Sequence, residues 1–215
     1  MSNPRQLYVV SKENNVMRLS WMRSLYWSVS LLALSLISGC QSSPPKQYFV
    51  LTAPSLQIEP GSTSLEYDIG IGPIEIPEYL NFTQMVYPLE DGSLQRMANS
   101  YWAEPLDQGI GRVVSINLNQ SDHSRKLVLF PWGAENSPQY SVKIKLMSLS
   151  RDSNNVRLNV YWDLIDNQVN RHITQQHFTA VTKAGATAPD MVSAYSHLLT
   201  QLSEQIDKSL QQLPE

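Results

Sequence analysis

Two stretches in the second half of the chain alternate strictly between apolar and polar residues. Their apolar positions are Val142, Ile144 and Leu146 in the first stretch, and Val156, Leu158, Val160, Trp162 and Leu164 in the second. Successive side chains of a strand point to opposite faces, so each stretch predicts a strand with one buried and one exposed face. The polar segment 152–155 between them predicts the turn of a hairpin. A sheet of this kind needs another layer over its apolar face.

The C-terminal segment can supply that layer. Its apolar residues recur at the spacing of an amphipathic helix: Met191, Tyr195, Leu198, Leu199, Leu202, Ile206 and Leu210. Thr187-Ala188-Pro189-Asp190 predicts the start of this helix, because proline suits the first turn and an acid is favoured by the helix dipole. The apolar stripe fits either packing on a sheet or binding of a partner, and the sequence leaves both open.

The remaining segments complete an α+β pattern. Strands are predicted at 48–52, 67–76, 84–89, 93–98, 127–130 and 171–181, and a helix from Leu106 to Leu118. We therefore expect a single α+β domain with a mixed, largely antiparallel sheet of about seven strands, covered on one face by two helices. Gly70 and Gly72 leave one side of their strand bare, which predicts that another segment packs closely there.

Near the N-terminus, an apolar run ends at the chain's single cysteine, Cys40. Arg18 and Arg23 precede the run, and the small residues Ser38 and Gly39 separate it from the cysteine. A basic segment, a short apolar segment and small residues are the parts of a secretory signal. The run has about a dozen residues, whereas a bilayer-spanning helix needs ~20. Leu36-Ile37-Ser38-Gly39-Cys40 looks like a bacterial lipobox, in which the cysteine is acylated and becomes the first residue; an uncleaved membrane helix is the alternative.

This interpretation divides the chain into three parts. Residues 1–39 are the N-terminal extension and the signal that is removed, residues 40–47 are the lipidated cysteine and a short tether, and residues 48–215 are the folded domain. The true start can be Met1, Met17 or Met22. Gln41 follows the cysteine, at the position where an aspartate signals retention at the inner membrane. Its presence favours the periplasmic face of the outer membrane. The seven residues of the tether reach about 23 Å at ~3.3 Å each.

Composition excludes several functions. The net charge is −3, and four of the 16 basic residues precede Cys40 with only one of the 19 acids, so the domain is more acidic still. That balance argues against a nucleic-acid partner and against electrostatic binding to anionic lipid headgroups. The four histidines form no metal-binding motif, and His172 and His177, five apart on a predicted strand, are expected on opposite faces. We expect no catalytic residues, no metal and no cofactor.

Tyr101-Trp102-Ala103-Glu104-Pro105-Leu106 places two large aromatic residues and an acid where a strand meets a helix. Trp102 fits either a core position or an interface, where tryptophan and tyrosine are enriched. Together with two residues of the earlier turn, the candidate partner interface is Tyr79, Leu80, Tyr101, Trp102 and Glu104.

Three blocks in this order after a lipobox resemble one known family. They are Tyr48 to Thr52, Ile69-Gly70-Ile71-Gly72-Pro73-Ile74-Glu75-Ile76-Pro77-Glu78-Tyr79-Leu80, and Trp102-Ala103-Glu104-Pro105-Leu106. The sequence resembles the ABC-type transport auxiliary lipoprotein family, and most closely its members in the Pqi intermembrane transport system. The likeness covers essentially all of the folded domain.

The resemblance implies a non-enzymatic lipoprotein of the outer membrane. Its expected partners are a membrane protein of the Pqi system and an MCE-domain protein that forms a tube across the periplasm and carries phospholipid. It would dock that tube at the outer membrane and support envelope integrity. Symmetry adds a separate hypothesis: if the tube is symmetric, several copies gather around it in a closed ring. An outer-membrane assembly or cell-wall scaffold lipoprotein and a periplasmic lipid carrier are the rival hypotheses.

Overall fold

The computed structural model describes residues 26–27, 44–54, 67–89, 91–121 and 125–213 of the 215. The chain separates into two units, Met1–Pro44 and Pro45–Glu215. In the first unit the described residues are Tyr26 and Trp27, which are helical and exposed, and Pro44. Cys40 lies outside the described residues, so its predicted lipidation stays a prediction. All of the elements from β1 onward belong to the second unit.

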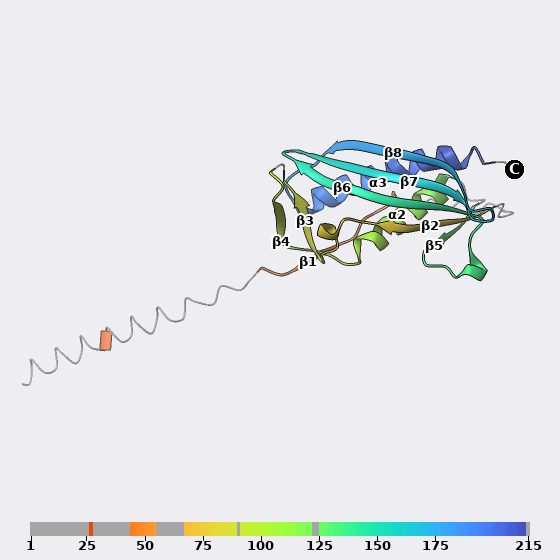
Figure 1. Cartoon of the computed structure of the whole chain (residues 1–215). Coiled ribbons are helices and arrows are strands. Elements are labelled where there is room, and N and C mark those ends of the chain that lie inside the picture. The colour runs from red at the N-terminus through yellow and green to blue at the C-terminus, as the bar shows by residue number, and fades with distance from the viewer. Residues whose placement is uncertain (1–25, 28–43, 55–66, 90, 122–124, 214–215) are drawn as a thin grey trace, which may run out of the picture. The chain divides into compact units, whose positions relative to one another are not determined.

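The large sheet has five strands in the order β5-β2-β6-β7-β8 (Figure 1). Their bounds are β2 Tyr67–Glu75, β5 Arg125–Leu129, β6 Tyr140–Asp152, β7 Asn155–Asp166 and β8 Arg171–Lys183. β2 runs parallel to both of its neighbours, whereas β6, β7 and β8 are antiparallel. The predicted hairpin is confirmed, since β6 and β7 pair along almost their whole length.

A second, smaller sheet has the order β1-β4-β3. Its strands are β1 Gln47–Phe49, β3 Gln84–Pro88 and β4 Leu94–Trp102. β1 is parallel to β4 and β3 is antiparallel to it. This corrects the expectation of one sheet, although the α+β class is confirmed. Pro77 and the short 3₁₀ turn η1, Glu78–Leu80, redirect the chain after β2, so β3 starts a new ladder.

Two long helices in the described part of the chain cover one face of the large sheet (Figure 1). α2, Leu106–Ser121, packs on β2 and β5, and α3, Ala188–Leu210, packs on β7 and β8; the helices also contact each other. The predicted start of α3 is confirmed. The Thr187 hydroxyl accepts a hydrogen bond from the Asp190 backbone N–H, and the Asp190 carboxylate accepts one from the Thr187 N–H. This reciprocal pair satisfies two backbone donors at the helix start.

The core lies between this helical layer and the sheet. The five alternating apolar residues of β7 are at most 2 % exposed, as predicted, and they face the apolar stripe of α3. Seven of the stripe residues belong to the same core cluster, so packing explains the stripe: Met191, Tyr195, Leu198, Leu199, Leu202, Ile206 and Leu210. The other face of the sheet carries polar and exposed residues such as Lys143, Lys145 and Tyr161.

The loop between β5 and β6 folds back onto the bare side of β2. A Cβ atom at Gly70 would lie 2.5 Å from both Trp132 Cη2 and Pro138 Cγ, and one at Gly72 would lie 2.6 Å from Phe130 Cβ. Gly72 also has a φ of +122°, which side chains rarely adopt. The predicted close packing against these glycines is therefore confirmed, and the segment that provides it is 130–138.

We predict that Gly70→Ala destabilises the domain by about 1–3 kcal/mol, because the new methyl group overpacks Trp132 and Pro138. Gly133→Ala is the matched control, since Gly133 has an extended backbone and a Cβ there would meet no atom within 4 Å. Urea unfolding of both variants measures the difference. Equal unfolding midpoints would contradict the packing described here.

Candidate functional site

Four of the five predicted interface residues lie around the end of the small sheet. Leu80 and Trp102 are 3 % and 6 % exposed and belong to the core cluster, and the Trp102 ring centroid lies 6.3 Å from that of Tyr195 on α3. Glu104 is partly exposed in the loop between β4 and α2. Tyr101 points the other way from Trp102, because neighbouring strand residues face opposite sides. The structure therefore places the Trp102 ring at a core position.

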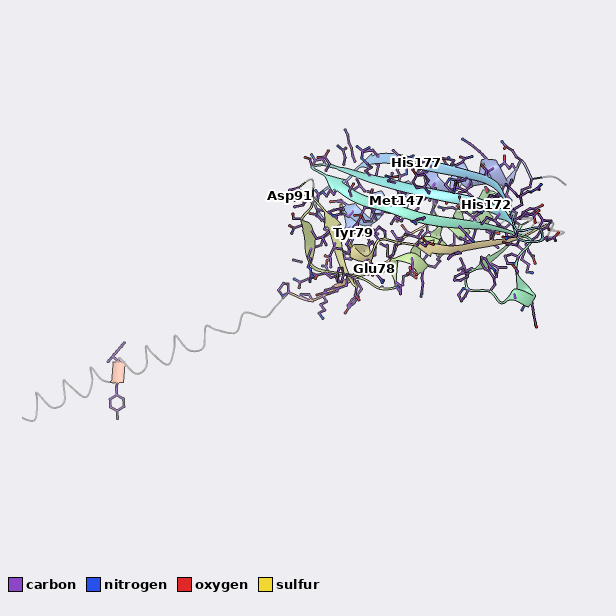
Figure 2. The ribbon with its side chains drawn as sticks, in the orientation of Figure 1. Glu78, Tyr79, Asp91, Met147, His172 and His177 are labelled. Atoms are coloured by element: carbon purple, nitrogen blue, oxygen red, sulfur yellow. The ribbon has the colours of Figure 1, made fainter. Side chains whose placement is uncertain are left out.

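Tyr79 is the member that lies apart from the others. It is half-buried beside β6, where Figure 2 labels it, and its phenol hydrogen bonds with the Leu149 backbone. Burial raises the pKa of Tyr79, and that hydrogen bond acts in the opposite direction. Its ring therefore helps to join η1 to the large sheet.

The residues of the two segments 80–83 and 102–106 line an open cavity of about 270 Å³, here called the groove. The Trp102 backbone N–H donates to the Thr83 carbonyl at 2.7 Å, which holds the two walls together. Leu80, Trp102 and Leu106 are buried, while Phe82 is 46 % exposed at the rim. Small-molecule pockets occupy roughly 300–1,000 Å³. The groove is thus the size of one or two protein side chains, with an apolar base and a polar wall at Glu104.

An ion pair fixes the Glu104 wall. The Arg112 guanidinium of α2 binds the Glu104 carboxylate and donates to the Leu51 carbonyl at 2.9 Å. One side chain therefore joins the chain after β1, the loop after β4 and α2. Sequence reasoning missed Arg112, because its partners are eight and 61 residues away and no short-range pattern links them.

The first strand brings further aromatic and basic groups to this end. Tyr48 pairs with Tyr101 in the ladder between β1 and β4, and their ring centroids are 5.7 Å apart. The Lys46 Nζ lies 5.2 Å from the Tyr101 ring centroid. On β4, the Arg96 guanidinium lies 5.5 Å from the Phe82 ring centroid. These distances fit cation–π contacts.

The two histidines of β8 do not lie as predicted. Ile173 is an extra residue in β8, since Leu164 pairs with Thr174 and Ile165 with His172. This bulge places His172 on the same face as His177, because their partners on β7, Ile165 and Tyr161, are four residues apart. His172 Nδ1 lies 3.9 Å from an Asp163 carboxylate oxygen. The centroid of the His177 ring lies 4.7 Å from that of Tyr161, which is two residues before Asp163 on β7. Among the described residues, no group of three His, Cys, Asp or Glu side chains could hold a metal ion.

The layer between the helices and the large sheet is closely packed. Between α2, α3 and the large sheet, a void of about 10 Å³ remains among Leu106, Ile110, Leu158, Tyr195 and Leu199. Burial of Tyr195 raises its pKa strongly, as expected for a phenol in this core. Among the described residues, no helix has the length and apolar character needed to cross a bilayer.

The fold and the site define a small α+β domain with two mixed sheets and a surface groove. The family model described as ABC-type transport auxiliary lipoprotein component matches residues 49–207, and the chain belongs to this family. The family is an auxiliary lipoprotein component of transport.

Two solved structures share the fold. One is a crystal structure of an uncharacterized protein, with a TM-score of 0.63 and 20 % identity over 78 % of this chain and 99 % of the other. The second is protein XCC0632 from Xanthomonas campestris, with a TM-score of 0.57 and 14 % identity over 74 % of this chain and 92 % of the other. No curated protein matches the sequence. At these identities, the two structures support the fold alone.

We predict that Trp102→Ala destabilises the domain by about 3–5 kcal/mol, because it removes a buried ring from the core. Tyr48→Ala is the control, since that ring is 60 % exposed and its loss should change stability by no more than about 0.5 kcal/mol. Chemical denaturation of the purified variants provides the comparison. A Trp102→Ala protein as stable as the control would show that the ring does not support the core.

Proposed function

We propose that this protein is an outer-membrane lipoprotein, acylated at Cys40, that serves as a non-catalytic component of an MCE-type intermembrane lipid transport system. Within its family it would correspond to PqiC, also called YmbA, the lipoprotein of the Pqi system. Its partners are then an MCE-domain protein that spans the periplasm and the membrane protein of the same system. It docks the far end of the MCE tube at the outer membrane and thereby supports envelope integrity.

The observation that carries this proposal is the family match, which spans residues 49–207 and thus nearly the whole folded unit. The order of the sequence features supports it, because a lipobox and a short tether directly precede the first strand. A single acyl chain holds a protein only marginally at a membrane, so stable anchoring needs more than one. A lipobox cysteine provides such an anchor.

The groove is our candidate for protein docking. Leu80, Trp102 and Leu106 form a buried apolar base, and a partner side chain of moderate size would fit above them. The hot-spot residues of protein interfaces often anchor by filling a small, well-packed pocket on the partner. A ring of copies around a symmetric tube would repeat this contact and close it.

The two rival functions predict different contacts. A lipid carrier needs an apolar cavity of several hundred Å³, whereas the void between helices and sheet holds about 10 Å³. A scaffold lipoprotein would contact a β-barrel assembly machine or peptidoglycan, so crosslinking in intact cells separates it from the transport function.

We predict that Cys40→Ala releases a folded protein from the outer-membrane fraction, because the domain then lacks its acyl chains. Fractionation with immunodetection, and circular dichroism of the released protein, test this. Gln41→Ala is the control and should stay membrane-bound. Unchanged fractionation of Cys40→Ala would contradict the anchor.

We predict that Ala103→Arg abolishes crosslinking to the MCE-domain protein in intact cells, because the long side chain covers the groove that Ala103 lines. Val169→Arg is the matched control: Val169 is 64 % exposed in the turn between β7 and β8, away from the groove. Both variants should fractionate with the outer membrane. Crosslinks to a β-barrel machine or to peptidoglycan in place of an MCE protein would support the scaffold function.

A further inference from the structure

The small sheet has an outward face that the core does not cover. Trp102, Met97 and Phe49 pack against the core, so their strand neighbours Tyr101, Arg96 and Tyr48 point outward. The pairing of β3 with β4 shifts register between Gln84 and Val86, and this irregularity keeps Tyr101 and Arg96 on one side although they are five residues apart. Leu94 shares the side of Arg96, two residues earlier on β4, and Phe82 lies under the Arg96 guanidinium. We call these five residues the outward face: Tyr48, Phe82, Leu94, Arg96 and Tyr101.

Several large apolar side chains are exposed on this face. Tyr48 is 60 % exposed, and Phe82 and Leu94 are each 46 % exposed. Val50, two residues beyond Tyr48, adds another apolar side chain at 43 %. Exposed apolar side chains that gather on one face fit a contact with a membrane or another macromolecule.

The charges of this face differ from those of the whole chain. The strands β1, β3 and β4 contain Arg96 and no acid, although the chain carries a net charge of −3. Lys46 adds a second cation, held over Tyr101. The nearest acids in the sequence are Glu78 before Phe82, Glu90 and Asp91 between β3 and β4, and Glu104, which is bound by Arg112.

Aromatic rings next to Lys and Arg are suited to the boundary between hydrocarbon and headgroups. Tyrosine places an apolar ring in the membrane and its hydroxyl in water, and basic side chains reach the phosphates while their stems lie along apolar surface. A Lys or Arg near an anionic membrane surface is attracted to it. This composition favours a lipid surface over a protein partner as the occupant.

The short length of chain between Cys40 and β1 also favours a lipid surface as the partner of the outward face. Cys40 is seven residues before Gln47, where β1 begins, and those residues span at most about 23 Å. With acyl chains on Cys40, Tyr48 cannot leave the neighbourhood of the bilayer. The part of the fold that the anchor holds nearest to lipid is thus the part with exposed aromatic and basic side chains.

We propose that the outward face rests on the headgroup region of the bilayer that holds the anchor, which fixes the orientation of the domain. This inference depends on the acylation of Cys40 put forward above. The acyl chains provide attachment, and the outward face determines which side of the domain meets the membrane. Arg151, near the turn between β6 and β7, lies over Tyr87 of the small sheet, so this turn is at the membrane end of the domain. The turn between β7 and β8 is at the other end of β7 and then points away from the lipid.

The test uses the full lipoprotein in vesicles of phosphatidylethanolamine and phosphatidylglycerol. Because acylation consumes the single native cysteine, Leu94→Cys introduces one reactive thiol for an environment-sensitive fluorophore. Val169→Cys is the matched control, as both positions are exposed. We expect the label at position 94 to shift its emission to the blue and to lose intensity with nitroxide-labelled phospholipid, and the label at position 169 to do neither.

A second variant tests the cause of the orientation. Replacing Tyr48, Phe82 and Leu94 together by serine should leave flotation with the vesicles unchanged, because the anchor remains. It should also make a label at Val169→Cys accessible to the lipid quencher, because the domain is then free to rotate. Circular dichroism verifies the fold of this variant.

The remaining outcomes separate the two proposals. Equal quenching at both positions, or none at position 94 in protein that floats with vesicles, would overturn the orientation while leaving the anchor intact. Energy transfer between labels at position 94 without lipid quenching would assign this face to a second copy and would also overturn it. Protein that fails to float would refute acylation itself, and the orientation with it.

Discussion

The large sheet covers its apolar face with two helices and leaves most of its other face exposed, and the rest of the structure depends on that constraint. α2 and α3 cover the apolar side of β2, β5, β7 and β8, and the buried ion pair between Arg125 on β5 and Asp207 on α3 joins the two layers. Such a pair adds little net stability but makes the loss of either partner costly. Because the layer between the helices and the sheet is closely packed, contacts with other molecules are left to surfaces outside it. These include the groove, the small sheet and a cavity of about 470 Å³ lined by polar residues of α2 and α3.

The small sheet carries the features that connect fold to function. Arg112 of α2 binds Glu104, after β4, and the Leu51 carbonyl, after β1. These contacts join the small sheet, and with it the groove and the outward face, to the helix. The groove offers a socket for a side chain, and the outward face offers aromatic and basic groups to lipid. On our proposals, one end of the domain therefore meets both the membrane and the protein partner, as an adaptor at the end of a transport tube requires.

Local patterns predicted much of this fold, and long-range contacts set the limit. The alternation in β7 and the capping residues Thr187 and Asp190 act within a few residues, so the sequence revealed them directly. Gly70 indicated close packing, but its partner Trp132 is 62 positions away. The bulge at Ile173 and the separation into two sheets depend on strand pairing, which periodicity does not encode. Arg112, which binds Glu104, and Arg96, which lies over Phe82, were missed because their partners are distant in the sequence.

The central claim is that an acylated cysteine holds a chemically inert domain at the outer membrane. Mass spectrometry of the N-terminal peptide, taken from protein extracted from native membranes, tests it most directly. Our account predicts a chain that begins at Cys40 and carries a thioether-linked diacylglycerol with an acylated amino group. A free thiol at Cys40, or a chain that retains residues before it, would contradict the account.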